Sequence, residues 1–198
     1  MKVVIIKYNA GNVASVQFAL NRLGVDAIVC DDSAVISTAD KVLFPGVGEA
    51  SSAMRALTNA GLDKTIVGLK QPVLGICLGM QLLCAYSEEG STKALGVFNT
   101  NVRRIDSGIQ TVEEKIPHVG WNDIAQLKSK IYSGINESSF VYYVHGFCAD
   151  VCEQTNSITE YVRPFSAGLE KNNFYGVQFH PEKSGVTGER IIRNFLEL

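Results

Sequence analysis

Two short segments of the chain carry side chains that together could attack an amide. Residues 75–81 read Gly-Ile-Cys-Leu-Gly-Met-Gln, and residues 176–182 read Gly-Val-Gln-Phe-His-Pro-Glu. They supply a cysteine nucleophile (Cys77), an imidazole base (His180) and a carboxylate (Glu182). Acyl transfer from an amide needs a nucleophile, a base that takes its proton, and a group that orients the base. We therefore predict that these three side chains form a catalytic triad.

The cysteine is expected on a sharp turn between a strand and a helix. The apolar run 73–76 predicts a buried strand, and residues 80–86 predict a helix packed on it. Such a turn needs small neighbours, and Gly75 and Gly79 lie two residues either side of Cys77. The thiol would then point out of the sheet, with a helix N-terminus beneath it that favours a thiolate and a developing oxyanion.

The histidine is expected at the end of another strand. Residues 175–180 predict that strand, and Pro181 ends it. His180 and Glu182 are two residues apart and would point to the same side of an extended chain. The carboxylate would then fix one imidazole tautomer while the other ring nitrogen meets the thiol. In a parallel sheet both motifs would lie at carboxyl ends of strands, where such sheets place their sites.

Backbone N–H groups near the cysteine are candidates for an oxyanion hole. Leu78 follows the nucleophile directly, and its N–H is the first candidate. The loop Phe44-Pro45-Gly46-Val47-Gly48 has two glycines within three residues, so its backbone can turn freely. We predict that Val47 supplies the second donor; an ordinary turn at the end of a strand is the alternative.

Polar side chains downstream of the cysteine are candidates for holding a substrate. Gln81 lies about one helical turn after Cys77, where an amide can recognise a polar molecule near the thiol. Glu88 and Glu89 close the same helical stretch, and one of them could bind a substrate ammonium group. A surface glutamine and a solvated acidic pair are the ordinary alternatives.

Composition excludes several broad classes of function. The chain has 198 residues with 46% hydrophobic and 19% charged, ordinary values for a globular protein. A net charge of −2 gives no electrostatic reason to expect nucleic acid as a partner. No run approaches the roughly 20 apolar residues that span a bilayer, so we expect no membrane partner. Five cysteines without disulfide-type spacing favour reduced thiols and a cytoplasmic location.

The order of predicted elements indicates a three-layer α/β fold with a mostly parallel central sheet. In the first half, strands at 3–6, 26–30, 41–44 and 73–76 alternate with helices at 12–23, 49–60 and 63–70. After Gly90 come shorter predicted strands at 96–98, 101–105, 138–145, 158–163 and 165–169, then a helix at 188–198. We expect one domain over residues 1–198, with one mixed sheet whose second half is antiparallel.

Two further groups of residues are open to more than one interpretation. His145, Cys148 and Cys152 have the spacing of metal ligands, but a closed zinc site needs a fourth ligand and the chain has no Cys-x-x-Cys pair. We therefore predict no metal. His118 precedes the only tryptophan, Trp121, and we interpret residues 117–122 as a structured loop near the site.

These motifs resemble those of the class I (triad) glutamine amidotransferases. The family's Gly-x-Cys-x-Gly-x-Gln elbow is matched at 75–81 and its His-Pro-Glu at 180–182. The resemblance extends over essentially the whole chain, through Tyr8-Asn9-Ala10-Gly11-Asn12, Pro45-Gly46-Val47-Gly48, His118-Val119-Gly120-Trp121-Asn122, Tyr142-Tyr143-Val144-His145 and Lys183-Ser184. Within the family, these further segments resemble a glutaminase component of histidine biosynthesis.

The resemblance implies a flavodoxin-like fold and a reaction that needs no cofactor. Cys77 would attack the glutamine side chain and release ammonia, leaving a thioester that water hydrolyses to glutamate. Ammonia would pass to a separate cyclase of (β/α)8-barrel fold, in a heterodimer. The residues it implies at the substrate are Gly46, Gln81 and Glu89, and those at the partner interface are Asn12, Trp121, Tyr142 and Lys183. The resemblance also implies that the Val47 N–H does not readily face the oxyanion in the free subunit, and therefore that the isolated chain has low activity.

Three alternatives stay open at this stage. The chain could be another cysteine hydrolase or peptidase on a similar fold, although Gln81 and the Pro-Gly-Val-Gly loop favour a small amide. It could serve a different synthase, such as the pyridoxal phosphate synthase glutaminase. It could also be a partner protein that kept the fold without catalysis, although the intact Cys-His-Glu set speaks against this.

Overall fold

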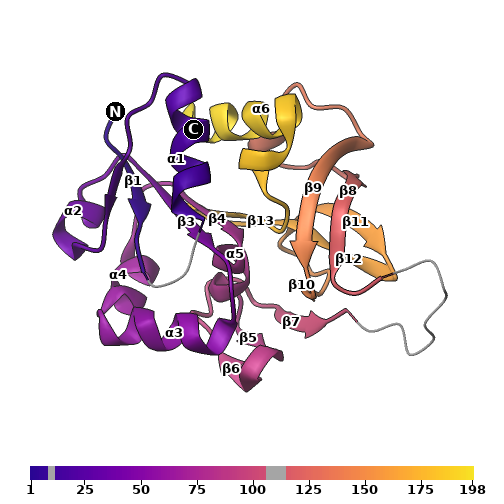
Figure 1. Cartoon of the computed structure of the whole chain (residues 1–198), viewed down its shortest axis with the longest axis horizontal. Helices are drawn as coiled ribbons and strands as arrows, with labels where there is room; N and C mark the ends of the chain where they lie inside the picture. The colour runs from indigo at the N-terminus through magenta and orange to yellow at the C-terminus, as the bar shows by residue number, and fades with distance from the viewer. Residues whose placement is uncertain (9–11, 106–114) are drawn as a thin grey trace.

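A seven-stranded sheet forms the centre of the molecule (Figure 1). The computed structural model describes residues 1–8, 12–105 and 115–198. Four of the pairings in this sheet are parallel, and those of β11 with β12 and of β12 with β13 are antiparallel. In spatial order the strands are β11 (Thr155–Tyr161), β12 (Arg163–Lys171), β13 (Phe174–Val177), β4 (Val73–Cys77), β3 (Lys41–Gly46), β1 (Val3–Ile6) and β2 (Ile28–Cys30).

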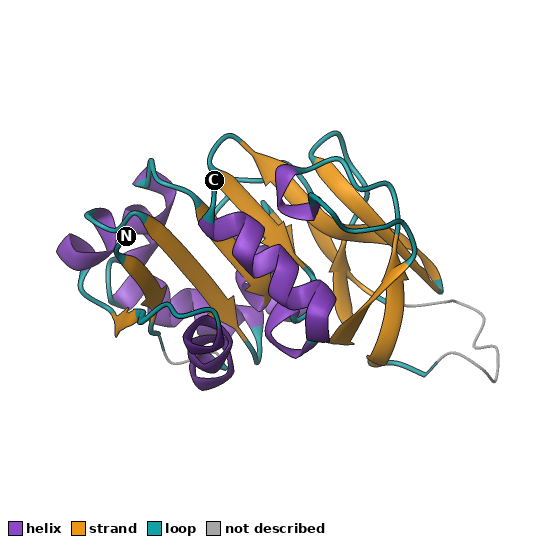
Figure 2. Ribbon diagram, turned by 90° about the horizontal axis from the view of Figure 1, so that it is seen from above, coloured by secondary structure: helices purple, strands orange, loops and turns teal. Residues whose placement is uncertain are grey.

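Helices cover both faces of this sheet, as Figure 2 shows from above. Alternate strand residues point to opposite faces, so Val3 and Ile5 belong to one buried cluster and Val4 and Ile6 to the other. The first cluster includes the inner faces of α1 (Val13–Arg22) and α6 (Gly185–Leu196). The second includes those of α2 (Ser33–Ser37), α3 (Ala50–Asn59), α4 (Leu62–Gly68) and α5 (Leu78–Leu83).

Two smaller sheets lie beside the central one. The antiparallel ribbon of β8 (His118–Ile124) and β9 (Ser139–His145) crosses the end of the molecule occupied by β11 and β12 (Figure 1). A four-stranded sheet has the order β10 (Phe147–Ala149), β7 (Asn101–Arg104), β5 (Tyr86–Ser87) and β6 (Thr92–Lys93). Short 3-10 helices η1 (Glu89–Ser91), η2 (Lys130–Tyr132) and η3 (Pro181–Lys183) complete the described elements.

The predicted three-layer α/β class with a mostly parallel sheet is confirmed. The central sheet is mixed, with antiparallel strands from the second half of the chain, as predicted. The expectation of a single sheet is wrong, because the β8–β9 ribbon and the four-stranded sheet are further sheets. Residues 96–98 form no strand; Gly96 adopts a φ of +71°, which an extended strand excludes. Residues 118–122, predicted as a loop, belong to β8, whose mixed polar and aromatic residues hid the alternation.

The turn after β4 depends on close packing of backbone against backbone. A Cβ atom on Gly79 would overlap the carbonyl oxygen of Phe44 in β3. One on Gly75 would lie 2.9 Å from the Cα of Met80, well inside van der Waals contact. The two glycines therefore let α5 approach the sheet directly behind Cys77, as the sequence pattern predicted.

No helix in the described ranges is long and apolar enough to cross a membrane.

Replacing Gly79 by alanine should destabilise the fold strongly, because the new methyl group has no space between α5 and β3. We expect a loss of about 3 kcal/mol in the free energy of unfolding, measured by urea denaturation. Gly68→Ala is the matched control: it lies in α4 with nothing near its Cβ position, and should change stability by no more than about 1 kcal/mol. Equal stability of the two variants would contradict the packing argument.

Candidate active site

Cys77 is the last residue of β4, held between two neighbouring parallel strands. Gly46 of β3 is its register partner on one side. On the other side, Val177 of β13 pairs with Ile76, so the residue after Val177 lies beside Cys77. Cys77 has a φ of +53°, in the left-handed region that residues with a Cβ rarely adopt. The chain turns there directly into α5, so the predicted elbow is present, although the helix is shorter than expected and spans Leu78–Leu83.

His180 and Glu182 lie against each other as predicted, but the local backbone is different. The strand ends at Val177 and Glu182 belongs to the 3-10 helix η3, so the pair is not on an extended chain. Glu182 Oε1 nevertheless accepts a hydrogen bond from His180 Nδ1 at 2.8 Å, and both side chains are buried. The turn enforced by Pro181 brings the carboxylate back onto the ring.

The sulfur of Cys77 and the carboxylate flank the imidazole. Burial lowers the pKa of His180, but hydrogen bonds to Cys77 and Glu182 and the charges of these two groups outweigh it and raise the pKa to about 10. The imidazole is therefore protonated at neutral pH. A protonated imidazole beside a cysteine can give its proton to a departing group, as a general acid does.

A cavity of about 210 Å³ opens onto the cysteine and the histidine. It is smaller than the roughly 300–1,000 Å³ of pockets that hold drug-sized ligands, which suits a small polar molecule. The residues that line it are Val47, Gly48, Cys77, Leu78, Gln81, Glu89, Val144, His145, Gly146, Phe147, His180 and Lys183. The triad cysteine and histidine thus share the cavity with both predicted oxyanion donors and two of the three predicted substrate residues.

The two polar substrate candidates already have partners within the protein. Gln81 Nε2 donates to Phe147 O and to Gln178 Oε1, each at 2.9 Å, which leaves its oxygen Oε1 for a ligand. Glu89 Oε2 accepts from the backbone N–H of Ala50 at the start of α3. Burial raises the pKa of Glu89, while that hydrogen bond opposes the rise. Both side chains offer acceptors, which match a substrate ammonium group.

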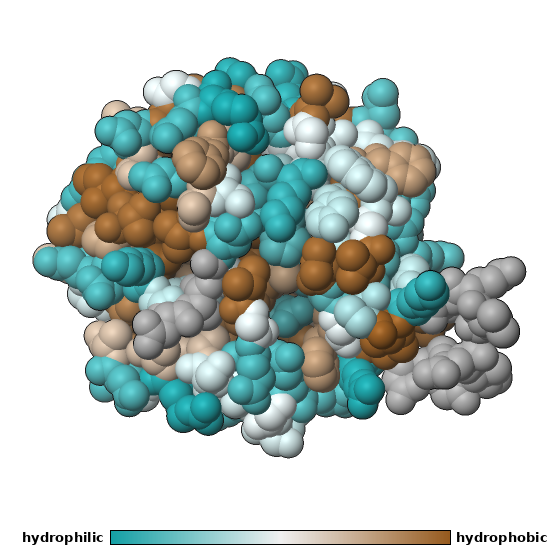
Figure 3. All heavy atoms as spheres, viewed as in Figure 1, coloured by the Kyte–Doolittle hydropathy of each residue, from teal (hydrophilic) through white to brown (hydrophobic). Residues whose placement is uncertain are grey.

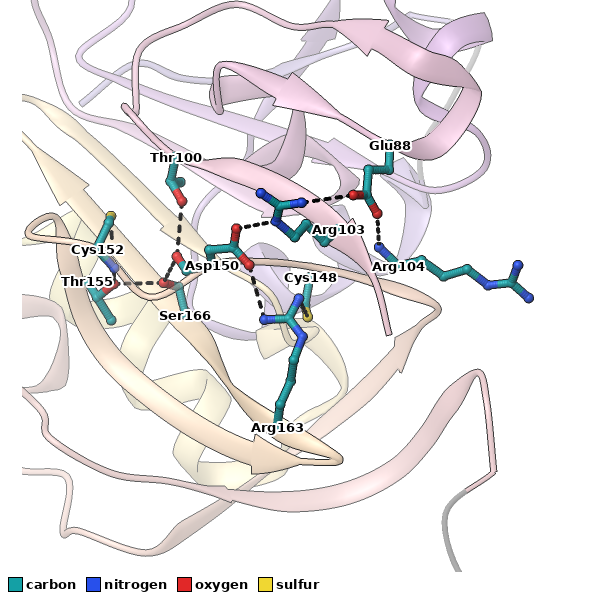
Figure 4. A network of polar contacts seen from close by, with 10 residues as sticks. All are labelled: Glu88, Thr100, Arg103, Arg104, Cys148, Asp150, Cys152, Thr155, Arg163 and Ser166. Atoms are coloured by element: carbon teal, nitrogen blue, oxygen red, sulfur yellow. Dashed lines mark hydrogen bonds and ion pairs between the residues drawn. The ribbon is translucent and has the colours of Figure 1, made fainter. Parts of the chain in front are cut away.

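Glu88, the neighbouring acid, has a structural role instead. It accepts from the guanidinium of Arg103 at 3.1 Å and from the backbone N–H of Arg104 at 2.9 Å (Figure 4). Arg103 also binds Asp150, which in turn accepts from Arg163. This network ties the four-stranded sheet to β12. Glu88 does not line the cavity.

The loop after β3 is partly exposed. Val47 is 41% exposed and Gly48 has a φ of +106°, so the backbone turns sharply at the cavity wall. Gly46 is buried in the sheet beside Cys77 rather than in the cavity wall, and a Cβ atom there would collide with the Tyr8 hydroxyl. Its predicted contact with substrate therefore has no support in the cavity lining.

The four predicted interface residues lie on neighbouring parts of the fold, because η3, which contains Lys183, packs against both α1 and β9. Trp121 and Tyr142 face each other across the β8–β9 ribbon, edge to face at 5.8 Å between ring centroids. Lys183 is exposed at the cavity. Asn12 caps α1 by accepting from Ser15 N at 3.4 Å. Residues 9–11 of the 8–12 motif lie outside the described residues.

The residues considered as metal ligands are separately engaged. His145 Nδ1 lies 2.8 Å from Phe147 O and its Nε2 lies 3.0 Å from His118 Nδ1. Cys148 is buried behind Arg163. In the part of the chain that the structure describes, no group of three or more histidine, cysteine or acidic side chains is arranged to hold a metal ion.

The structure also places in the site groups to which the sequence analysis assigned no role there. The carbonyl oxygen of Val144 lies 3.9 Å from Cys77 Sγ, and that of Tyr142 accepts from His180 N at 2.9 Å. Gln178, inside the second motif, contacts the sulfur from the end of β13. A parallel pairing of the strands around 76 and 177 would have placed Gln178 beside Cys77, but the order of strands could not be read from the sequence.

Comparisons with known proteins identify relatives over the full length. A sequence model of the family described as "Glutamine amidotransferase class-I" matches residues 4–198. A protein of Bacteroides fragilis (strain YCH46) named "Imidazole glycerol phosphate synthase subunit HisH" is 57% identical over 198 residues, covering all of both chains. Proteins of the same name from Bacteroides thetaiotaomicron and Yersinia pseudotuberculosis are 54% and 44% identical, again covering all of both chains.

Solved structures show the same fold at low sequence identity. A putative GMP synthase component from Thermoplasma acidophilum is 20% identical, with a TM-score of 0.75 over 100% of this chain and 93% of that one. A structure described as a glutamine amidotransferase is 18% identical, with a TM-score of 0.74 over 100% of this chain and 98% of that one. Both support the predicted fold and nothing finer.

The raised pKa of His180 predicts how stability depends on pH. Below pH 6.5 both the folded and the unfolded chain carry the proton, and the full stabilisation is present. Between pH 6.5 and pH 10 the unfolded chain loses this proton while the folded chain still holds it. Unfolding then releases a proton, so the stabilisation is progressively lost as the pH rises toward 10. The difference in unfolding free energy between wild type and His180→Gln should therefore shrink from pH 6 to pH 9.5 in urea titrations. A difference independent of pH would contradict the assignment.

Two buried histidines should act in the opposite direction. Burial lowers the pKa of His145 to about 3 and of His118 to about 4, so both are neutral in the folded chain. Their contribution is present above pH 6.5 and is lost as the pH falls through 4 and 3, because the unfolded chain takes up protons first. We expect the unfolding free energy of His118→Phe, measured by urea denaturation, to fall less steeply than that of wild type as the pH is lowered from 6.5 to 4. An equally steep fall in both proteins would contradict this prediction.

Proposed function

Because the chain belongs to the class-I glutamine amidotransferase family, we propose that it hydrolyses glutamine to glutamate and ammonia through a thioester on Cys77. The ammonia passes to a separate cyclase that makes imidazole glycerol phosphate and aminoimidazole carboxamide ribotide in histidine biosynthesis. The observation that supports the triad most strongly is His180 held between Cys77 and the Glu182 carboxylate at one small cavity.

The first half of the proposed reaction forms the thioester. The thiolate of Cys77 attacks the side-chain amide carbon of glutamine, and the carbonyl oxygen becomes an oxyanion. The N–H groups of Leu78 and Val47 stabilise that charge. Protonated His180 then gives its proton to the departing nitrogen, the C–N bond breaks, and ammonia leaves.

The second half returns the enzyme to its starting state. Neutral His180 takes a proton from a water molecule, whose oxygen attacks the thioester carbon. The C–S bond breaks, and glutamate leaves with the thiolate restored. Glu182 keeps the imidazole in one orientation and stabilises its charge throughout, while Gln81 Oε1 and Glu89 accept from the substrate ammonium group.

We infer that the cyclase is a (β/α)8 barrel that binds as a heterodimer over the β8–β9 ribbon. One face of this ribbon exposes apolar side chains that a globular surface would otherwise bury: Val119 (56% exposed), Trp121 (55%), Phe140 (58%) and Val144 (38%). Figure 3, drawn in the same view as Figure 1, shows hydrophobic residues among hydrophilic ones at the right of the molecule, where β8 and β9 lie. Exposed apolar patches with polar surroundings are typical of protein interfaces.

The proposed interface is continuous with the active site. The backbone of β9 supplies the carbonyl oxygens of Val144 and Tyr142, which contact Cys77 and His180. Val47, partly exposed at the cavity, follows directly on Gly46, the register partner of the cysteine. A partner that presses on these residues would act directly on the nucleophile and on the oxyanion loop, the name used here for residues 44–48.

We propose that the chain is a single domain over residues 1–198 and works in the cytoplasm.

Ammonia release from glutamine tests the function. The purified chain should turn over glutamine slowly by itself and much faster with a histidine-pathway cyclase and its ribonucleotide ligand, because the family resemblance implies that the Val47 N–H does not face the oxyanion in the free chain. Cys77→Ala should abolish release, while Cys30→Ala, in β2, should leave it unchanged. Strong turnover by the lone chain would contradict the gating, and no stimulation by the cyclase would remove the pathway assignment.

The partner surface has its own test. Trp121→Ala should weaken binding of the cyclase by about 2 kcal/mol, roughly 30-fold in Kd, because exposed aromatic side chains commonly dominate interfaces. Calorimetric titration of the two proteins measures this. Val67→Ala, an exposed apolar residue of α4, is the matched control and should bind as wild type does. Equal weakening by both variants would contradict the proposed location of the interface.

A further inference from the structure

A buried glutamine contacts the proposed nucleophile from the side opposite to the oxyanion loop. Gln178 follows β13, whose last residue pairs with Ile76, so the parallel register brings it beside Cys77. Its side chain is completely buried, and its Nε2 lies 3.7 Å from Cys77 Sγ. At that distance to sulfur an amide N–H donates a hydrogen bond.

The neighbouring groups fix which end of this amide faces the sulfur. The carbonyl oxygen of Phe147 can only accept, so the atom of Gln81 that contacts it at 2.9 Å is the donor nitrogen. The same nitrogen contacts Gln178 at 2.9 Å, so the atom it meets there is the acceptor Oε1. The other end of the Gln178 amide, the donor Nε2, therefore points at Cys77.

The hydrogen bonds around Phe147 O, Gln81, Gln178 and Cys77 form a connected series, and two histidines adjoin it at Phe147 O. Because Phe147 O accepts, His145 carries its proton on Nδ1, and its bare Nε2 accepts from His118 Nδ1. The lowered pKa values of both rings are consistent with two neutral imidazoles. His118 is fixed between the rings of Tyr161 and Tyr143, at centroid distances of 3.8 and 4.8 Å. Every donor in the series has an acceptor that it can reach.

We propose that Gln178 is a positioning residue for the nucleophile: its amide N–H aims the sulfur of Cys77 and stabilises the thiolate. A hydrogen bond to a charged acceptor in a buried site is stronger than one to a neutral acceptor, so the donor favours the charged form of sulfur. Gln81 has two functions in this arrangement, since its nitrogen orients Gln178 while its oxygen stays at the cavity. The inference rests on the proposed glutaminase function, which makes Cys77 the nucleophile.

Several other titratable groups surround the sulfur and must be kept constant in a test. His180 and Glu182 approach from the segment after β13, Tyr8 from the end of β1, His145 from β9, and Glu89 and Lys183 from the cavity wall. None of them is changed by a substitution at Gln178. A shift in the reactivity profile of Cys77 on such a substitution is therefore attributable to the amide.

The test is the rate of alkylation of Cys77 by iodoacetamide against pH, followed by mass spectrometry of the peptide. Gln178→Glu keeps the acceptor for Gln81 but replaces the donor by a carboxylate oxygen; Gln178→Met removes both groups at similar length. We expect the pH midpoint of alkylation to rise by about one unit in Gln178→Met, and further in Gln178→Glu. The rate near neutral pH should fall about tenfold. At high pH the rates should converge on that of wild type.

A structural role alone would give a different result. It would lower the rate equally at all pH values, or lower the melting temperature without moving the midpoint, and either outcome would overturn the proposal. Gln154→Glu is the matched control: Gln154 accepts from Asn99 N away from the cavity and should leave the profile unchanged. Wild-type Cys77 that alkylates no faster than Cys30 would instead refute the proposed function, so the two failures are distinguishable.

Discussion

The structure depends on one constraint, the left-handed backbone of a cysteine at the carboxyl end of a central strand. Cys77 has a Cβ atom where φ is +53°, and the surrounding packing must hold it there. Gly79 lets α5 lie directly against the Phe44 carbonyl, and the neighbouring strands fix the cysteine from both sides. The sulfur is thereby held at the edge of the sheet toward which β3, β4 and β13 all run. A relaxed turn would lose all of these contacts together.

That position also decides what can reach the sulfur. His180 approaches from the segment after β13. The backbone of β9 crosses nearby, and two of its carbonyl oxygens contact Cys77 Sγ and His180 N. One face of the β8–β9 ribbon is exposed and apolar. A ribbon that touches the reacting groups through its backbone and the proposed partner through its side chains gives a short physical route between them. Such coupling requires no change in the central sheet, whose two cores are closely packed.

The sequence predicted the parts of this arrangement that local patterns determine. Continuous apolar runs indicated the parallel strands, and glycines around Cys77 indicated the elbow. The pairing of His180 with Glu182 was expected, but on an extended chain rather than through η3, because a 3-10 turn after a proline leaves no periodic signal. The sequence pattern predicts part of the β8–β9 ribbon as a loop, because its exposed face is apolar and breaks the usual alternation. Gln178 was missed because its neighbour across the sheet is 101 residues away along the chain.

The most direct test of the account is to trap the covalent intermediate. The chain is mixed with labelled glutamine in the presence of the cyclase and its ligand, quenched in acid within the first turnover, and digested. We expect label on the peptide that contains Cys77, and we expect hydroxylamine to release it, as it releases a thioester. Hydrolysis of glutamine with no label on this peptide, or with label on another cysteine, would contradict the central claim.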